Sequence, residues 1–231
     1  MFALRFVVAG KLAHFRRFYT NSSSLTYPIP PPPTLRGLLG AAVGLGPEYA
    51  DRFAKLRFGI RPAAPWRFLM QTANFLKIKR GEANYAGGEH TQIPLQLVAP
   101  RRLEDRVRYE VLVVGEGALD LLKALKNPRY PLSLGPAYAL AHVEAAEAIE
   151  GDVAEGASGP VLGAFLREGL AGLKASGGLR LLEDRYPLRL AADRTPLAVG
   201  DLIVEATGQP VELDYRAPVF LAGGHAWALV G

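Results

Sequence analysis

The sequence predicts an α+β fold: a ferredoxin-like or RRM-type βαββαβ domain over residues 1–143, followed by a smaller, mostly β segment. Three observations predict it. Up to residue 143, segments rich in β-forming residues alternate with two amphipathic helical segments. Beyond residue 179, short runs of alternating apolar and polar residues are separated by Gly, Pro and Asp. The chain has 231 residues, 49% of them hydrophobic, which is enough for a substantial core.

The first predicted elements are a strand and a helix, joined by a proline-rich loop. Phe2–Ala9 is rich in β-forming residues and predicts a strand. The prolines between Pro28 and Pro33 oppose a helix, so the helix is expected to begin at Thr34, whose hydroxyl can cap the N-terminus. A second helical piece is expected over Glu48–Leu56.

Four further elements complete the βαββαβ pattern. Strands are expected over Trp66–Lys79 and Arg106–Val114, and a helix over Gly115–Lys126. A bent strand or a strand pair is expected over Tyr130–Val143. Arg80–Pro100, between the first two, is long, polar and glycine-bearing, and such an excursion inside a compact domain is usually functional. In the RNA-binding version of this fold, the open sheet face and its loops meet the nucleic acid.

The last third of the chain is predicted to form a separate, smaller domain. Residues 144–160 are acidic and rich in Ala and Gly, which indicates a linker. Val161–Lys174 predicts a short amphipathic helix, and Leu179–Gly231 predicts several short strands. The smaller domain would therefore cover residues 161–231.

Composition excludes several classes of function. There is no cysteine, and the four histidines lie far apart without metal-binding spacing, so neither a disulfide framework nor a metal site is expected. No phosphate-cradling NTPase motif occurs and Gly115-x-Gly117 is only a fragment of a dinucleotide fingerprint, so we expect no cofactor. The N-terminal apolar run is too short for a signal peptide or membrane helix, which predicts a cytoplasmic protein with no membrane partner. Twenty arginines against seven lysines, with 18 prolines, suggest a thermophilic host as a hypothesis.

The charge is unevenly distributed along the chain. Residues 1–100 hold 13 Lys and Arg against 4 Asp and Glu, a balance of +9. Residues 101–231 hold 14 against 18, a balance of −4. A basic region of this size attracts phosphates and makes binding salt-dependent, so nucleic acid is the expected partner.

The stretch Phe15–Ala42 combines the residue types that bind single-stranded RNA. Arginines can pair with phosphates, aromatic rings can stack on unpaired bases, and small polar side chains can hydrogen-bond sugars or base edges. The prolines would hold the loop rigid and so reduce the entropy lost on binding. Arg36 lies in the first helical turn, where an anion bound at the helix N-terminus would stabilise its charge. The predicted RNA-binding residues of this stretch and its flank are Lys11, His14, Arg16, Arg17, Tyr19, Asn21, Ser22, Ser23, Ser24, Tyr27 and Arg36.

The polar excursion supplies further candidates. Lys77, Lys79, Arg80, His90 and Gln92 are predicted to contact RNA. Catalysis remains an alternative, because metal-independent RNA cleavage needs a general acid and base near a 2′-hydroxyl. The groups available for it are His14, Tyr19, Tyr27, His90 and either Lys77 or Lys79. A metal-dependent nuclease is disfavoured because residues 1–100 hold only four carboxylates, and we assign no catalytic residue.

Two stretches resemble a known family. The first, LRFVVAGKLAHFRRFYTNSSSLTYPIPPPPTLRGLLGAAVGL, is similar to the N-terminal signature of the CRISPR-associated RAMP proteins of the Cas-five family. In that signature a strand leads to a Phe-Arg segment, a hydroxyl-rich loop with Tyr-Pro-x-Pro-Pro, and a helix with Gly-Leu-Leu-Gly. The second, YPLSLGPAYALAHV, resembles the family's Tyr-Pro-x-x-Leu-Gly strand, although Pro136-Ala137 replace the polar residue that often follows the glycine.

This resemblance implies a subunit of a type I CRISPR surveillance complex, or Cascade, which acts in antiviral defence. Members hold the 5′ tag of CRISPR RNA, cap a filament of backbone RAMP subunits and contact the large subunit that helps recognise target DNA. It also implies a long β-hairpin insertion, the thumb, at about Lys77–Arg106. Some members cut repeat RNA with a Tyr-Lys-His set, but no Lys-His pair occurs here. Two alternatives stay open: a metal-independent endoribonuclease that processes repeat RNA, and an unrelated RNA-recognition module.

Overall fold

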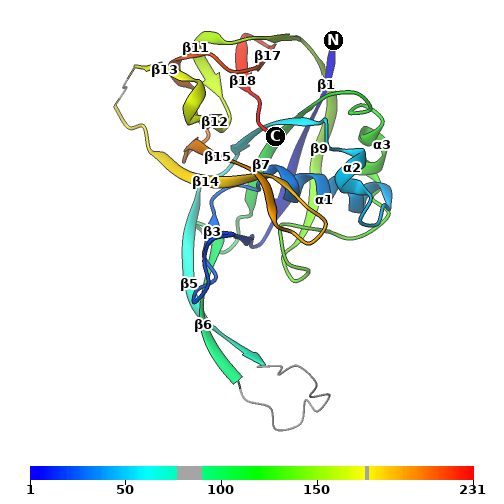
Figure 1. Cartoon of the computed structure of the whole chain (residues 1–231), viewed down its shortest axis with the longest axis vertical. Helices are drawn as coiled ribbons and strands as arrows, with labels where there is room; N and C mark the ends of the chain where they lie inside the picture. Colours follow the sequence, from blue (N-terminus) through cyan, green and yellow to red (C-terminus); the bar gives the residue numbers. More distant parts are fainter. Residues whose placement is uncertain (77–89, 175–176) are drawn as a thin grey trace.

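A five-stranded antiparallel sheet forms the centre of the N-terminal part (Figure 1). The computed structural model describes residues 1–76, 90–174 and 177–231. In the sheet the strands lie in the order β4-β7-β1-β9-β8. Their bounds are β1 Phe2–Gly10, β4 Arg57–Pro62, β7 Val107–Val114, β8 Leu132–Ser133 and β9 Leu140–Glu150.

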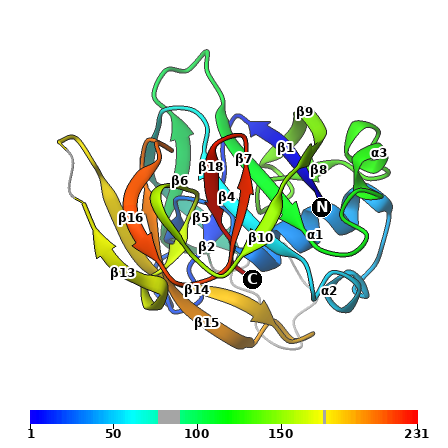
Figure 2. The same ribbon diagram turned by 90° about the horizontal axis from the view of Figure 1, so that it is seen from above.

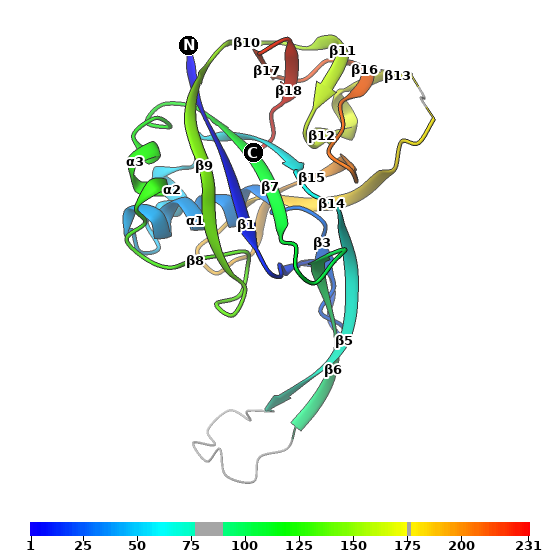
Figure 3. The same cartoon turned by 180° about the vertical axis from the view of Figure 1, so that it is seen from behind.

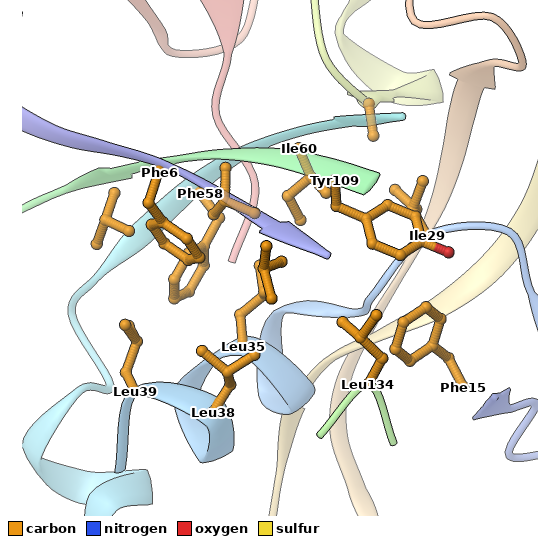
Figure 4. Close-up of a cluster of buried hydrophobic side chains, with 14 of the residues drawn as sticks. Phe6, Phe15, Ile29, Leu35, Leu38, Leu39, Phe58, Ile60, Tyr109 and Leu134 are labelled. Atoms are coloured by element: carbon orange, nitrogen blue, oxygen red, sulfur yellow. The ribbon is translucent and has the colours of Figure 1, made fainter. Parts of the chain in front are cut away.

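Three helices lie beside this sheet and bury its first face (Figure 3). They are α1 Pro32–Val43, α2 Tyr49–Arg52 and α3 Leu121–Lys126. Figure 4 shows Leu35, Leu38 and Leu39 of α1 near Phe6 of β1 and Phe58 of β4. These five side chains are each at most 5% exposed, so the interface with α1 is a dry core that stabilises the sheet.

The opposite face of the sheet is covered at one end by the C-terminal part (Figure 2). A six-stranded sheet there has the order β10-β17-β18-β11-β16-β13. Its strands are β10 Asp152–Ala154, β11 Ala157–Leu162, β13 Leu170–Leu173, β16 Val211–Tyr215, β17 Val219–Ala222 and β18 His225–Ala228. Phe220 and Trp227 pack with Ala3 and Leu112 of the central sheet, which joins the two parts through a common core.

A three-stranded sheet of the C-terminal part packs against α1. It consists of β12 Phe165–Leu166, β14 Leu181–Leu190 and β15 Pro196–Glu205, in the order β12-β15-β14. A 3-10 turn follows β12 at Arg167–Gly169. Tyr186 of β14 and Leu202 of β15 are buried in the same core as α1.

A long hairpin, β5 Trp66–Leu76 and β6 His90–Pro100, projects away from the body (Figures 1 and 3). Its arms pair from Trp66 opposite Pro100 to Leu76 opposite His90. A two-stranded ribbon, β2 Phe15–Arg16 and β3 Thr26–Tyr27, lies against its base. Backbone bridges Ala13–Val98 and Ser24–Leu95 fix this contact.

The first helix differs from the sequence expectation at its N-terminus. It begins at Pro32, with Pro31 at the N-cap and no side-chain cap, so Thr34 lies inside the helix. Proline is tolerated there because the first N–H groups of a helix have no intrahelical acceptor. The second helix is also shorter than expected, at Tyr49–Arg52.

The second strand of the expected βαββαβ pattern was placed wrongly. The central sheet uses β4, Arg57–Pro62, whereas Trp66–Leu76 is an arm of the projecting hairpin. The short β4 segment carries Gly59 and Pro62, which weaken its local signal, and its position is decided by pairing with β7. The predicted thumb therefore begins earlier than Lys77, and residues 77–89 lie outside the described residues.

Residues 144–174 were also predicted wrongly. The expected linker holds most of β9, all of β10 and part of β11. The expected helix over Val161–Lys174 is made of strand segments and a 3-10 turn, because its glycines break helical geometry; Gly163, for example, has φ +90°. The helix expected over Gly115–Lys126 is confined to Leu121–Lys126.

No helix among the described residues is long and apolar enough to span a bilayer.

Candidate nucleic-acid interface

The predicted RNA-binding loop is held at both ends by its own ribbon. We define the β2–β3 loop as residues 17–25, between Arg16 of β2 and Thr26 of β3. The Arg17 N–H donates to the Leu25 carbonyl at 2.9 Å, and the Phe15 N–H donates to the Thr26 hydroxyl at 2.8 Å. The Ser24 N–H donates to the Pro94 carbonyl of β6 at 2.8 Å. The loop thus projects from the base of the hairpin on a fixed frame.

His14 ties this frame together and is inaccessible to a ligand. It is 6% exposed, and its Nδ1 lies 2.7 Å from the Gln96 carbonyl of β6. A carbonyl can only accept, so Nδ1 carries the proton and Nε2 accepts from the Ser24 hydroxyl at 3.0 Å. Burial lowers the pKa of His14 and so favours the neutral ring, in which Nε2 is the acceptor of the Ser24 hydroxyl. His14 and Ser24 therefore act on the loop's support.

Tyr27 is also turned inward. Its side chain is fully buried and stacks on Tyr186 of β14, with ring centroids 4.2 Å apart and an angle of 25° between the rings. Its hydroxyl donates to the Arg185 carbonyl at 2.6 Å. Burial raises the pKa of Tyr27 well above its ordinary value. The ring that was predicted to stack on a base stacks instead on the C-terminal part of the chain.

Asp184 of β14 connects the loop to the C-terminal part. Its carboxylate lies 3.1 Å from the Arg17 guanidinium and accepts the Tyr19 hydroxyl at 2.5 Å. Arg17 also donates to the Thr26 carbonyl at 3.3 Å, so its charge is already engaged within the protein. We conclude that Arg17 and Asp184 shape the loop, and that Asp184 is a site residue which sequence reasoning missed.

Arg36 does not present its charge to a bound anion. It is 4% exposed and donates to three backbone carbonyls: Phe53 at 3.0 Å, Leu188 at 2.8 Å and Leu56 at 3.2 Å. Its guanidinium also lies over the Phe58 ring. Arg36 therefore joins α1 to the chain before β4 and to β14, a structural role in place of the predicted RNA contact.

The outward part of the loop keeps the chemistry that the sequence predicted. Arg16, Asn21 and Ser22 are exposed, and Arg16 donates to the Thr20 carbonyl at 3.2 Å. Phe18 and Tyr19 are 40% and 46% exposed and meet edge to face, with centroids 5.4 Å apart. Ser23 is half-buried. One cation at the end of β2, and two aromatic rings and two polar side chains of the loop, are thus exposed.

The remaining candidates are divided between the hairpin and the end of β1. His90 and Gln92 are exposed on β6 and lie on one face of the hairpin, since they are two residues apart. The exposed Lys11 has its ammonium 3.2–3.3 Å from the carbonyls of Leu103, Glu104 and Asp105. Lys77, Lys79 and Arg80 lie outside the described residues.

The sheet face opposite the helices does not offer a platform for bases. Beyond the part covered by the C-terminal sheet, it carries a network of ion pairs. The Arg61 Nε donates to Glu110 at 2.6 Å, Arg5 pairs with both Glu110 and Glu147, and Arg108 pairs with Glu144 at 2.8 Å. The arginines of this face are already paired with carboxylates and so are not free to bind phosphate, and the expectation that the open face would meet RNA is not supported by this geometry.

Within residues 1–76, 90–174 and 177–231, no three His, Cys, Asp or Glu side chains gather in a way that could hold a metal ion.

Comparison with known protein families identifies the family of the chain. The model of the family described as CRISPR-associated protein (Cas_Cas5) matches residues 3–197, most of the chain. The chain belongs to this family. The Cas_Cas5 match spans the loop, the hairpin and all of β14, so the Asp184 contact lies within the matched region. The resemblance stated from sequence motifs is thereby confirmed.

Solved structures share the fold of this Cas_Cas5 protein. A CRISPR protein from Archaeoglobus fulgidus matches with a TM-score of 0.59 at 15% identity, covering 100% of this chain and 99% of that one. A chain of a CRISPR RNA-guided surveillance complex matches with a TM-score of 0.50 at 18% identity, covering 92% and 91% respectively. No curated protein sequence matches significantly.

Proposed function

We propose that this Cas_Cas5 protein is an RNA-binding, non-catalytic subunit of a type I CRISPR surveillance complex. In this role it holds the 5′ tag of CRISPR RNA and caps the filament of backbone subunits. Two facts support the proposal: family membership, and a fold shared with a chain of a CRISPR RNA-guided surveillance complex. Its site of action would be the cytoplasm, where CRISPR RNA is bound.

The observation that carries the RNA contact is the group of exposed side chains formed by Arg16 of β2 and the outward residues of the β2–β3 loop. Arg16 would pair with phosphate, and Phe18 and Tyr19 would stack on unpaired bases. Asn21 and Ser22 would hydrogen-bond sugars or base edges. Because the loop is anchored by Asp184 and by His14, little entropy remains to be lost when RNA binds. His90 and Gln92, on the hairpin arm, would extend the same contact.

We assign the N-terminal part to the ferredoxin-like class. The strand order β4-β7-β1-β9, with α1 after the first strand and α3 after the third, is the split βαβ arrangement of that class. In this protein the loops beside the sheet, and not its face, would meet the RNA.

The hairpin would contact the neighbouring subunit. Phe68, Met70 and Phe75 of β5 are 38%, 54% and 45% exposed on an arm that projects from the body. Exposed apolar side chains in such a position mark protein contacts. Backbone RAMP subunits are the proposed occupants, and the large subunit and target DNA would be reached through the assembled complex.

The test compares two neighbouring arginines in complex assembly on CRISPR RNA. Arg16→Ala is expected to weaken RNA binding and to reduce its salt dependence, because an exposed phosphate contact is lost. Arg17→Ala is expected to weaken RNA binding through a loosened loop, with a fall in thermal stability that Arg16→Ala does not show. If Arg16→Ala leaves assembly of the complex on CRISPR RNA unaltered, the β2–β3 loop does not hold the RNA.

The endoribonuclease alternative loses two of its candidate groups. His14 and Tyr27 are buried and engaged within the protein, so neither can reach a 2′-hydroxyl in this conformation. Incubation of the pure protein with repeat RNA in a chelator tests the alternative directly. A product ending in a 2′,3′-cyclic phosphate would establish cleavage and overturn the non-catalytic assignment.

A further inference from the structure

A basic hollow lies near the β2–β3 loop, at one end of β1. It has a volume of about 320 Å³ and is lined by Lys11, Leu12, Arg106 and the segment Tyr138–His142. The walls come from the start of β9 and from three connections: the one after β1, the one between β6 and β7, and the one between β8 and β9. Figure 3 shows these connections gathered at the same end of β1, beside the base of the hairpin.

The hollow and the β2–β3 loop are both held by the same short backbone segment, residues 12–14. Leu12 lines the hollow, and the next residue, Ala13, bridges to Val98 of the hairpin. The following residue, His14, donates its N–H to the Leu134 carbonyl at 3.0 Å, in the connection that leads to Tyr138. A single short segment of backbone therefore fixes the hollow on one side and the RNA-binding loop on the other.

The charges of the hollow are held in place. The Lys11 ammonium is fixed by the three carbonyls of residues 103–105, and Arg106 is half-buried at the end of the same turn. His142 lies 3.8 Å from Glu144, a carboxylate that pairs at 2.8 Å with Arg108. Lys11 and Arg106 thus line the hollow, Glu104 and Asp105 precede Arg106 in the same turn, and Glu144 of β9 is paired with Arg108.

An exposed aromatic ring completes the site. Tyr138 is 62% exposed, and burial of part of its ring raises its pKa, so the hydroxyl stays neutral. A large exposed tyrosine beside two cations has the composition of a base-stacking site with a phosphate contact. The volume is at the lower end of the range for small-molecule sites, about 300 Å³, which suits one nucleotide unit.

We propose that this hollow binds one nucleotide of single-stranded RNA, with the base on Tyr138 and a phosphate on Arg106. Lys11, whose ammonium is bonded to the carbonyls of residues 103–105, adds positive charge beside that phosphate. The inference rests on the proposed function in taking RNA as the ligand, and it adds a second contact point beyond the β2–β3 loop. His142 would supply a hydrogen bond to the base or sugar. The RNA would pass the anchored segment 12–14 between the two contacts.

The first test uses variants in direct RNA-binding measurements with the full chain and a labelled single-stranded RNA. Tyr138→Ala is expected to raise Kd about 5- to 100-fold, as loss of a base stack does. Arg106→Gln is expected to reduce the slope of log K against log salt by about 0.7, as loss of one phosphate contact on a single strand does. The matched controls, Tyr130→Ala and Arg216→Gln, alter exposed residues away from the hollow and are expected to bind like the unaltered chain.

The outcomes separate this inference from the proposed function. If the unaltered chain binds RNA and Arg16→Ala weakens it, while Tyr138→Ala and Arg106→Gln have no effect, the hollow is not a nucleotide site and the proposed function stands. The same conclusion follows if these two variants lose only co-purification with protein subunits.

If the unaltered chain binds no RNA, the proposed function fails, and the hollow is then tested with uridine 5′-monophosphate by NMR of tyrosine-labelled protein. A shift of the Tyr138 signal that Arg106→Gln abolishes supports the site, and no shift overturns it.

Discussion

The stacked pair Tyr27 and Tyr186 shows that two residues of the same type can contribute differently to stability. Tyr27 and Tyr186 are both buried and their rings lie 4.2 Å apart, but their hydroxyls differ. The Tyr27 hydroxyl donates to the Arg185 carbonyl, whereas that of Tyr186 is buried and has no hydrogen-bond partner among the described residues. A buried hydroxyl without a partner costs free energy, and a satisfied one contributes to stability.

The two tyrosines should therefore respond oppositely to loss of the hydroxyl. Tyr27→Phe is expected to lower the free energy of unfolding by about 1 kcal/mol, because one hydrogen bond is lost. Tyr186→Phe is expected to leave it unchanged or to raise it, because no bond is lost and a desolvation penalty is removed. Urea unfolding of the two variants measures the difference; equal destabilisation would contradict this assignment of the hydroxyls.

His14 predicts a pH dependence of stability. Its folded-state pKa is lowered from 6.5 by burial, so the unfolded chain binds the proton more tightly than the folded one. The contribution of His14 to stability is thus present above pH 6.5 and is lost as the pH falls through the lowered pKa. Melting temperatures between pH 7 and 5 should fall less steeply in His14→Gln than in the unaltered chain. His225→Gln, at an exposed position, is the control and should keep the full slope.

At the residue scale, the sequence predicted the types of side chain in the loop but not their directions. Arg16 and Arg17 are adjacent and chemically alike, yet one is exposed and the other is paired with Asp184. That pairing joins residues that lie 167 positions apart, so no local pattern could reveal it. The same holds for Arg36, whose carbonyl partner Leu188 is 152 positions away.

The projecting hairpin presents apolar side chains to solvent. One face of β5 carries Phe68 and Met70, and neither joins a buried core. Replacement of both by serine is expected to leave the fold intact with a modest loss of stability, because Phe68 is 38% exposed and meets the Trp66 ring edge to face. The same change should reduce co-purification with backbone subunits.

A matched control exists on another hairpin. Leu197 and Val199 of β15 are 57% and 45% exposed, so their replacement by serine removes similar apolar surface. Retention of the complex in that control, and its loss in the β5 variant, would assign the contact to the projecting hairpin. Equal loss in both would show that the effect is not specific to β5.

At the element scale, segments with a clear alternation of apolar and polar residues were predicted well. The strand at β1, the strand at β7 and the first three strands after Leu179 lie where the alternation indicated. The eleven-residue β9 was mostly missed, because its acidic and Ala-rich sequence indicated a linker. Short or glycine-containing segments were also missed, because their state depends on pairing with distant strands. β4 is the clearest case, since its six residues become a strand by pairing along β7.

The whole molecule depends on contacts between its N-terminal and C-terminal parts. Phe220, Trp227 and Leu229 cover the second face of the central sheet, and Tyr186 enters the core beside α1. The sequence suggested two domains joined by a linker, but the segment between them is largely strand. A shared core of this kind makes separate folding of the first part unfavourable.

Truncation tests that interdependence. A chain ending at Glu150 keeps the central sheet and its helices but exposes Ala3, Leu112 and Val114 to water. It is expected to lack a cooperative thermal transition, whereas the full chain shows one. Trp227→Ala in the full chain should lower the free energy of unfolding by about 3–5 kcal/mol, because a buried aromatic ring is removed. A cooperatively folded fragment would contradict the shared core.

The function proposed for this chain is recognition of the 5′ tag of CRISPR RNA. The most direct test measures Kd by fluorescence anisotropy for two RNAs of equal length, one with the repeat-derived 5′ tag and one without it, over a range of salt concentrations. We predict tighter binding of the tagged RNA at every salt concentration, with affinity falling as salt rises because phosphate contacts contribute. Equal affinity for the two RNAs would contradict the claim.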